Sequence, residues 1–350
     1  MLRRFLISLL APVVFISLVA CQNKEKSSSA PPGVEPQPTG APPFNVGLVF
    51  DVGGRGDKSF NDSAYAGLEM AKKQLPGLVF EVAQPPEGSD REALLRGMAA
   101  GKSQLTIGVG FLFTDDVLKI AKVFPDKNFA CVDMAVAEGQ TLPPNVAALK
   151  FREQEGSFLV GAIAGLLTKT NNVGFVGGAD SPLIRKFEKG FKAGVLHVNP
   201  DCKIQAAYAG IGGDAFTNPG KGKELALSMY HQGADIIFHA AGTTGLGVFK
   251  AAEELGKMAI GVDSDQRESA KPGVVLTSMI KRVDRSVAQS IADAAEGKFT
   301  GGVHEFGLKE DGVGYVYDQY NKDIIGESVR NKIEDLKKKI ISGEITVPSE

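Results

Sequence analysis

The feature that most constrains the fold of this chain is a regular alternation, from Phe44 onward, of short apolar runs with amphipathic stretches. Runs such as FNVGLVFDV, NFACVDM and ADIIFHAAG are typical of strands buried on both faces, whereas DSAYAGLEMAKKQL and similar segments have helical spacing. Strands and helices in repeated succession predict parallel sheets with helices on both faces, which is an α/β fold.

The alternation also starts over near the middle of the chain. The segment VGLVFDVGG at Val46 is echoed by VGFVGGAD at Val173, and each is followed by a helical stretch with aromatic residues and a glycine. A length of 350 residues suits two domains. We therefore predict two doubly wound parallel-sheet lobes, joined by a hinge that the chain crosses three times. The predicted lobes comprise residues 44–149 plus 264–298, and residues 150–263 plus 299–350.

The N-terminus has the character of an export signal. In MLRRFLISLLAPVVFISLVAC, two arginines precede a long apolar run, and residues 1–20 are predicted to be a signal peptide. The ending LVAC resembles a bacterial lipobox, which predicts cleavage before Cys21 and a lipid on its sulfur. Residues 22–43 are rich in Ser, Pro and Gly and predict a disordered tether. We expect a cell-envelope protein that is lipid-anchored to a bacterial membrane. The alternative is an ordinary signal peptide with an incidental Cys21.

Composition excludes several classes of function. The formal net charge is -2, from 39 basic and 41 acidic residues, and does not suggest nucleic-acid binding. The four histidines lack metal-ligand spacing, and no cofactor or metal is expected. A disulfide between Cys131 and Cys202 is possible after export, but their predicted positions in different lobes favour two separate thiols.

Polar residues close several of the strand-like runs. They are Asp51, Asp133, Asp263 and Lys281. Carboxyl ends of parallel strands gather at one edge, where open α/β folds bind ligands. Carboxylates accept hydrogen bonds from hydroxyls and ring N–H groups, while lysine donates them. The set suits a neutral, hydroxyl-rich ligand, although each residue taken singly is better explained as a helix cap or a solvated loop charge.

Two phenylalanines lie in loops that are otherwise polar. Phe60 follows GGRGDKS, and Phe216 lies within GGDAFTNPG. One ring from each lobe could sandwich a flat heterocycle, because aromatic side chains stack on bases. The alternative is that each ring packs against its own helix.

Several motifs together resemble one known family. DVGGRGDKSFN, AFTNPGKGKE, HAAGTTG, GVDSDQ and SMIKRVD occur in this order behind the lipobox. They resemble the Bmp (basic membrane protein) family of lipoproteins, the purine nucleoside-binding components of ABC transporters, which have the type I periplasmic-binding fold. The resemblance implies a binding protein that makes and breaks no bond, with a permease and an ATPase as partners.

The resemblance also implies roles for individual residues. Phe60 and Phe216 would stack on the two faces of the purine, and Asn61 and Asp133 would hydrogen-bond its edge. The ribose hydroxyls would be held by Asp51, Asp263 and Lys281, and Gly245 would let the backbone approach the sugar. Leu246 stands where many members of the family have a polar residue, which puts side-chain contacts from that turn in doubt.

The sequence bears on three other classes of protein. An exported purine nucleoside hydrolase would need a calcium site, yet the loop with Asp51 and Asp57 has no adjacent Asp pair and too few oxygen ligands. A nucleotide enzyme is disfavoured because GMAAGKS, residues 97–103, is one residue short of a P-loop and precedes a strand. A binding protein of the same fold for a sugar or another small polar ligand stays open.

Overall fold

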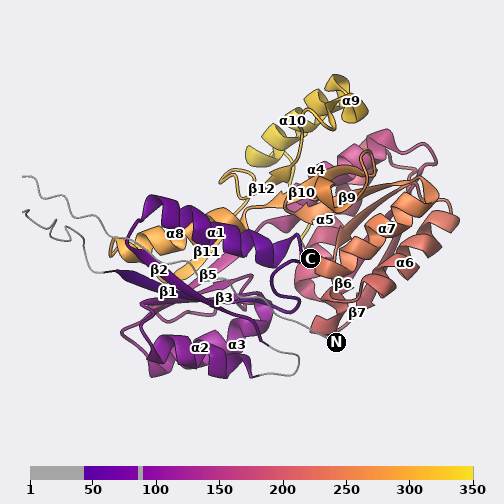
Figure 1. Ribbon diagram of the computed structural model, residues 1–350. Helices are drawn as coiled ribbons and strands as arrows, with labels where there is room; N and C mark the ends of the chain where they lie inside the picture. The colour runs from indigo at the N-terminus through magenta and orange to yellow at the C-terminus, as the bar shows by residue number, and fades with distance from the viewer. Residues whose placement is uncertain (1–42, 86–89, 350) are drawn as a thin grey trace, which may run out of the picture. The chain divides into compact units, whose positions relative to one another are not determined.

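The computed structural model describes residues 43–85 and 90–349, so the predicted signal peptide, Cys21 and nearly all of the predicted tether lie outside the described residues. Within this part of the chain the strands form two six-stranded sheets (Figure 1). Helices cover both faces of each sheet, which confirms the predicted α/β class with two lobes.

The first sheet has the strand order β11-β5-β4-β3-β1-β2, and all of its strand pairs are parallel. Its strands are β1 (Phe44–Val49), β2 (Leu78–Ala83), β3 (Leu105–Val109), β4 (Asn128–Val132), β5 (Val146–Phe151) and β11 (Gly302–Phe306). Helices α1 (Phe60–Gln74) and α8 (Val283–Ala295) lie on one side, and α2 (Arg91–Ala100) and α3 (Thr114–Val123) on the other (Figure 1). We call this sheet with its helices the first lobe.

The second sheet has the order β12-β10-β9-β8-β6-β7, in which β12 alone pairs antiparallel. Its strands are β6 (Asn172–Ala179), β7 (Lys203–Gly210), β8 (Ile236–Ala240), β9 (Met258–Asp263), β10 (Val275–Lys281) and β12 (Val313–Tyr315). Its helices are α4 (Glu153–Leu167), α5 (Pro182–Val198), α6 (Pro219–His231) and α7 (Gly245–Leu255), followed by α9 (Lys322–Ile325) and α10 (Glu327–Ile341). These elements form the second lobe.

Alternation along β6 shows why its sequence reads as a continuous apolar run. Val173 and Phe175 belong to the hydrophobic cluster that includes α4 and α5, whereas Val176 belongs to the cluster with α6 and α7. Successive side chains of a strand point to opposite faces, so a strand covered on both sides needs apolar residues at every position.

The chain crosses between the lobes three times, after β5, after β10 and after β11. The last two crossings differ from the predicted boundaries at 263/264 and 298/299, and these boundaries are corrected here. Strand β10 pairs with β9 of the second sheet, and β11 pairs with β5 of the first. The apolar run of β10 contains no information about which sheet it joins, because strand pairing is a long-range property. The short segment GVHEF of β11 was not recognised as a strand.

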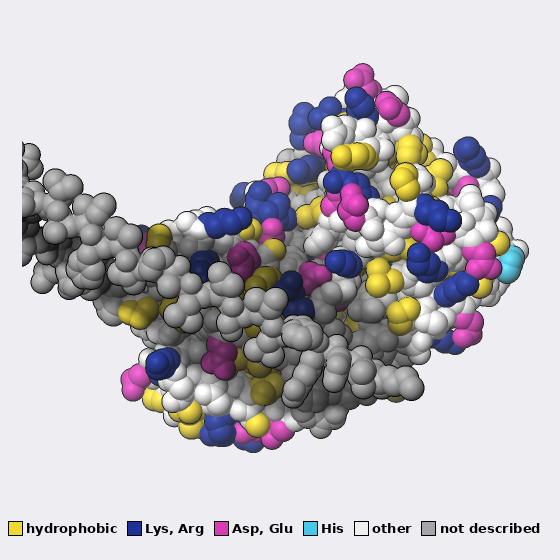
Figure 2. Space-filling view, in the orientation of Figure 1, with side chains coloured by type: hydrophobic (Ala, Val, Ile, Leu, Met, Phe, Trp, Pro, Cys, Tyr) yellow, Lys and Arg dark blue, Asp and Glu magenta, His cyan; other side chains and the backbone are white. Residues whose placement is uncertain are grey.

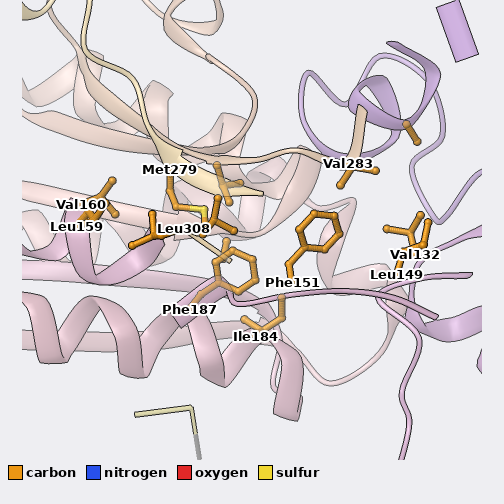
Figure 3. Packing of buried hydrophobic residues seen from close by; sticks show 14 of the residues in the cluster. Val132, Leu149, Phe151, Leu159, Val160, Ile184, Phe187, Met279, Val283 and Leu308 are labelled. Atoms are coloured by element: carbon orange, nitrogen blue, oxygen red, sulfur yellow. The ribbon is translucent and has the colours of Figure 1, made fainter. Parts of the chain in front are cut away.

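A continuous hydrophobic cluster joins the two lobes near these crossings (Figure 3). Phe151 ends β5 in the first lobe, while Phe187 of α5 and Met279 of β10 belong to the second. Phe187 also lines the cavity described below, so the cluster supports that cavity directly.

Helices α4 and α5 pack unusually closely because glycines face the opposing backbone. A Cβ atom on Gly161 would lie 2.2 Å from the carbonyl oxygen of Phe191, and one on Gly194 would lie 2.0 Å from that of Phe158. Both distances are shorter than any normal contact, so side chains are excluded there. The close packing holds α5 against α4, and the N-terminal half of α5 contributes apolar residues to the site.

The surface charge, the cysteines and the lengths of the helices bear on the remaining predictions from the sequence. On the face seen in Figure 2, Lys and Arg are interspersed with Asp and Glu. Cys131 and Cys202 are both buried and free. Among the helices within residues 43–85 and 90–349, none has the length and apolar character needed to cross a bilayer.

Candidate functional site

A cavity lies between the lobes at the carboxyl ends of the strands. It contains about 600 Å³ of space, part of it open to solvent. Its walls come from both lobes and include all but one of the sequence-predicted ligand residues: Asp51, Phe60, Asn61, Asp133, Phe216, Asp263 and Lys281.

Lys281, the last residue of β10, is the electrostatic centre of the cavity. Its side chain is buried, and its Nζ atom lies 2.6 Å from Asp133 Oδ2 and 3.0 Å from Glu153 Oε1. Burial opposes the charged form, but the two carboxylates outweigh it and raise the pKa of Lys281. Because Asp133 follows β4 of the first sheet, this ion pair crosses from one lobe to the other.

Three aromatic rings surround the same ammonium group. The Nζ atom lies 5.2 Å from the ring centre of Phe60, 5.0 Å from that of Phe151 and 5.5 Å from that of Phe187. Rings at such distances attract a cation through their negative faces. The rings therefore stabilise the charge of Lys281 and exclude water from it.

Asp133 has a strained backbone and one unused oxygen. Its φ of +60° is in the left-handed region, which is uncommon outside glycine. Burial raises the pKa of Asp133 to about 6, although the charge of Lys281 partly offsets this. Its Oδ1 atom is buried and has no hydrogen-bond partner among the described residues. A buried acceptor without a partner is costly, so this atom is suited to accept a hydrogen bond from a ligand.

Asp51 and Asp263 are also buried carboxylates. Burial raises the pKa of each to about 7. The N–H of Val52 donates to Asp51 Oδ1 at 2.8 Å, and the hydroxyl of Ser59 donates to Asp263 Oδ2. Ser59 is in the first lobe and Asp263 ends β9 of the second, so their hydrogen bond is another contact between lobes.

Asn61 lines the cavity, but its amide is already engaged within the protein. Its Oδ1 accepts from the N–H of Asp51 at 2.9 Å, and its Nδ2 donates to Asp57 Oδ2 at 3.1 Å. Asp57 in turn accepts from backbone N–H groups at the start of α1, including that of Asn61 at 2.7 Å. Asn61 and Asp57 thus fix the loop that presents Asp51 and Phe60. The predicted contact of Asn61 with a ligand stays a prediction, which the second lone pair of Oδ1 would permit.

Phe60 and Phe216 are half-buried and border the cavity from opposite lobes. Phe60 begins α1, and Phe216 ends a short 3₁₀ helix of the second lobe, Gly213–Phe216. Each ring also packs against the core, so the packing alternative holds in part. A Cβ atom on Gly178 would lie 2.3 Å from the Phe216 ring, which shows how closely that ring lies on β6.

Gly245 is the predicted residue that the cavity does not include. It begins α7, and a Cβ atom there would lie 2.1 Å from the ring of the buried His239. The glycine is therefore required by packing against His239. The backbone near the cavity at this turn belongs to Ala241, Gly242 and Thr243 instead.

Sequence analysis missed two parts of the site. Glu153 begins α4 and stands two residues after Phe151, the last residue of β5, so its place just beyond a strand end was a signal that could have found it. Leu183, Ile184 and Phe187 form an apolar wall on α5, and nothing in their amphipathic pattern distinguished them from core residues. Within the described residues, no group of His, Cys, Asp and Glu is arranged to hold a metal ion.

The raised pKa of Asp51 predicts a pH-dependent stability. A folded-state pKa of about 7 against an ordinary 3.8 means that ionised Asp51 opposes folding, by up to about 4 kcal/mol at high pH. The stability that the protonated group provides is complete below about pH 4 and is lost as the pH rises through 7. Asp51→Asn keeps an acceptor for the N–H of Val52 and removes the titration, so its free energy of unfolding should exceed that of the wild type at pH 8 and match it near pH 4.

Urea unfolding at both pH values measures this difference. Asp180→Asn is the control, because Arg185 lowers the pKa of the exposed Asp180 and no gain at pH 8 is expected. A gain for Asp51→Asn that is equal at both pH values would contradict the account.

Comparison with known proteins identifies the family. A family model described as Bmp, ABC transporter substrate-binding protein PnrA-like, matches residues 44–350. The CD4+ T-cell-stimulating antigen of Listeria monocytogenes is 39% identical over 327 residues, which cover 87% of this chain and 88% of that protein. The ABC transporter nucleoside-binding protein BmpA of Lactococcus lactis is 34% identical over 327 residues, which cover 87% and 89%.

A solved structure supports the same assignment. The ABC transporter solute-binding protein from Aeropyrum pernix K1 has a TM-score of 0.78 and 31% identity to this chain, and the match covers 88% of this chain and 94% of that one. The fold predicted from sequence, that of the type I periplasmic binding proteins, is thereby confirmed. This chain belongs to the Bmp family of ABC transporter substrate-binding proteins.

Proposed function

We propose that this protein is a membrane-tethered lipoprotein that captures purine nucleosides between its lobes for uptake by an ABC permease and its ATPase. The observation that carries the proposal is the presence, around one cavity, of two aromatic rings from opposite lobes together with three buried carboxylates and a lysine. The Lactococcus relative, named as a nucleoside-binding protein, supports it.

The aromatic rings suit the base. Phe60 and Phe216 border the cavity from different lobes, so a flat heterocycle between them would contact both lobes at once. Stacking of a base on an aromatic side chain contributes roughly 1–3 kcal/mol. At the edge of the base, the unpartnered Asp133 Oδ1 would accept the ring N–H of guanine or hypoxanthine.

The carboxylates suit the sugar and disfavour a phosphate. Asp51 and Asp263 would accept hydrogen bonds from ribose hydroxyls, and Lys281 would donate one. Among the described residues that line the cavity, Lys281 is the only one with a cationic side chain, and it is already paired with Asp133 and Glu153. A phosphate beside three carboxylates would therefore be repelled, so a nucleoside fits better than a nucleotide.

The two alternatives to a nucleoside-binding protein are a sugar-binding protein of the same fold and a nucleoside hydrolase. A sugar-binding protein of the same fold would also use carboxylates and aromatic rings, but it would bind free ribose as tightly as a nucleoside. A hydrolase would release free base, and the solute-binding relatives argue against it. Incubation with inosine is expected to release no hypoxanthine.

Phe60→Ala should weaken inosine binding far more than it lowers the stability of the fold. Losing one stacking face should cost about 1–3 kcal/mol, which is about a fivefold to 150-fold increase in Kd by calorimetry. Phe80→Ala is a matched control, because Phe80 is also half-buried but lies on β2, outside the cavity. If Phe60→Ala lowers the melting temperature sharply and leaves Kd unchanged, the ring has only a packing role.

Membrane tethering is proposed from the lipobox ending at Cys21, which lies outside the described residues. A lipid on Cys21 would anchor the chain by hydrophobic insertion. The variant Cys21→Ser should therefore move from the membrane to the soluble fraction after cell lysis, as followed by immunoblotting at low and high salt. Retention at high salt of the variant from which the signal peptide has been removed would mean that a second anchor exists or that the lipobox prediction is wrong.

A further inference from the structure

We infer that Gln266 is a positioning residue that holds the two lobes closed and so sets the place of Phe60. It does not line the cavity, and the inference rests on the proposed function only where ligand binding is measured. Gln266 is 1% exposed and lies between β9 and β10 in the second lobe.

The side chain is anchored firmly within its own lobe. Its Oε1 accepts from the N–H of Val262 at 2.8 Å, and the backbone N–H of Gln266 donates to Ser278 Oγ at 3.1 Å. The bond to Oε1 fixes the orientation of the amide and the backbone bond holds the turn, so that Nε2 points across to the first lobe. There it donates to the carbonyl oxygen of Lys58 at 3.1 Å.

Lys58, which accepts this hydrogen bond, has a backbone conformation that other contacts must stabilise. Lys58 has a φ of +56°, in the left-handed region that residues with a Cβ seldom adopt. Such conformations cost free energy and persist where neighbouring contacts hold them. The N–H of Lys58 donates to Asp62 Oδ2 at 3.1 Å, and its carbonyl takes the bond from Gln266.

A second bond between lobes starts at the very next residue. The hydroxyl of Ser59 donates to Asp263 Oδ2, and Asp263 has a left-handed φ of +65°. Two consecutive residues of the first lobe therefore bind two residues of one turn, 263–266, in the second. Phe60 follows directly, so this contact fixes the start of α1 and the ring at the cavity.

This geometry makes Gln266 a determinant of the rate at which a bound ligand leaves the cavity. A ligand enters while the lobes are apart and leaves only when they separate, so a buried hydrogen bond present only between closed lobes slows release. Gln266→Glu keeps an acceptor for the N–H of Val262 but places a carboxylate against the carbonyl of Lys58. Gln266→Met removes both side-chain bonds and carries no charge. Gln232→Met, at the exposed end of α6, is the matched control.

The test measures inosine dissociation and association by stopped flow with the full chain. Loss of one buried hydrogen bond corresponds to about a threefold to tenfold change in a rate or equilibrium constant. Gln266→Glu and Gln266→Met should therefore release inosine faster by roughly that factor, with little change in the association rate. Gln232→Met should behave as wild type. Adding Ser59→Ala to either variant should have less than its separate effect, because neighbouring contacts that act together are not additive. If both Gln266 variants release inosine at the wild-type rate, the proposal is overturned.

A second readout needs no ligand and separates this proposal from the proposed function. Spin labels at Lys122→Cys on α3 and Glu224→Cys on α6 report the distance between lobes, since both positions are exposed and on different lobes. The Gln266 variants should shift the distance distribution to longer values relative to wild type without inosine. If the wild type does not bind inosine, the proposed function fails. If the Gln266 variants leave the distance distribution between the lobes unchanged, the role of Gln266 is refuted, whether or not inosine binds.

Discussion

The arrangement of the site depends on a buried charge, the ammonium of Lys281, and on the two carboxylates that compensate it. Taking a lysine out of water is expensive unless close partners satisfy it. Asp133 satisfies it from the first lobe at 2.6 Å and Glu153 from the second at 3.0 Å. Because the partners come from both lobes, separating the lobes would leave Asp133 without its cation. The charge therefore ties the electrostatics of the cavity to its closure.

The same cavity holds acceptors at a cost in stability. Asp51, Asp133 and Asp263 are buried carboxylates with raised pKa values, and two of them have left-handed backbones. Strained and poorly solvated groups of this kind gather at functional sites. Hydroxyl and ring N–H donors of a bound ligand would replace the water that these oxygens lose on burial, which would offset part of the cost.

Much of this site could be predicted from sequence for a simple geometric reason. Parallel strands end at a common edge, so residues that close apolar runs meet there, and Asp51, Asp133, Asp263 and Lys281 did. What the sequence did not show depends on three-dimensional contacts that a local pattern does not specify. Pairing decides that β10 belongs to the second sheet, and the contact with His239 decides why residue 245 is glycine. The amide of Asn61 could not be assigned because its partners, Asp51 and Asp57, are set by the loop conformation.

The most direct test of the account compares a whole nucleoside with its two halves. Calorimetric titration of the wild-type protein with inosine, hypoxanthine and ribose would measure whether rings and carboxylates act on one ligand. The account predicts that inosine binds far more tightly than either fragment, because base and sugar are held by different parts of one cavity. Ribose that binds as tightly as inosine, or inosine that does not bind, would contradict it.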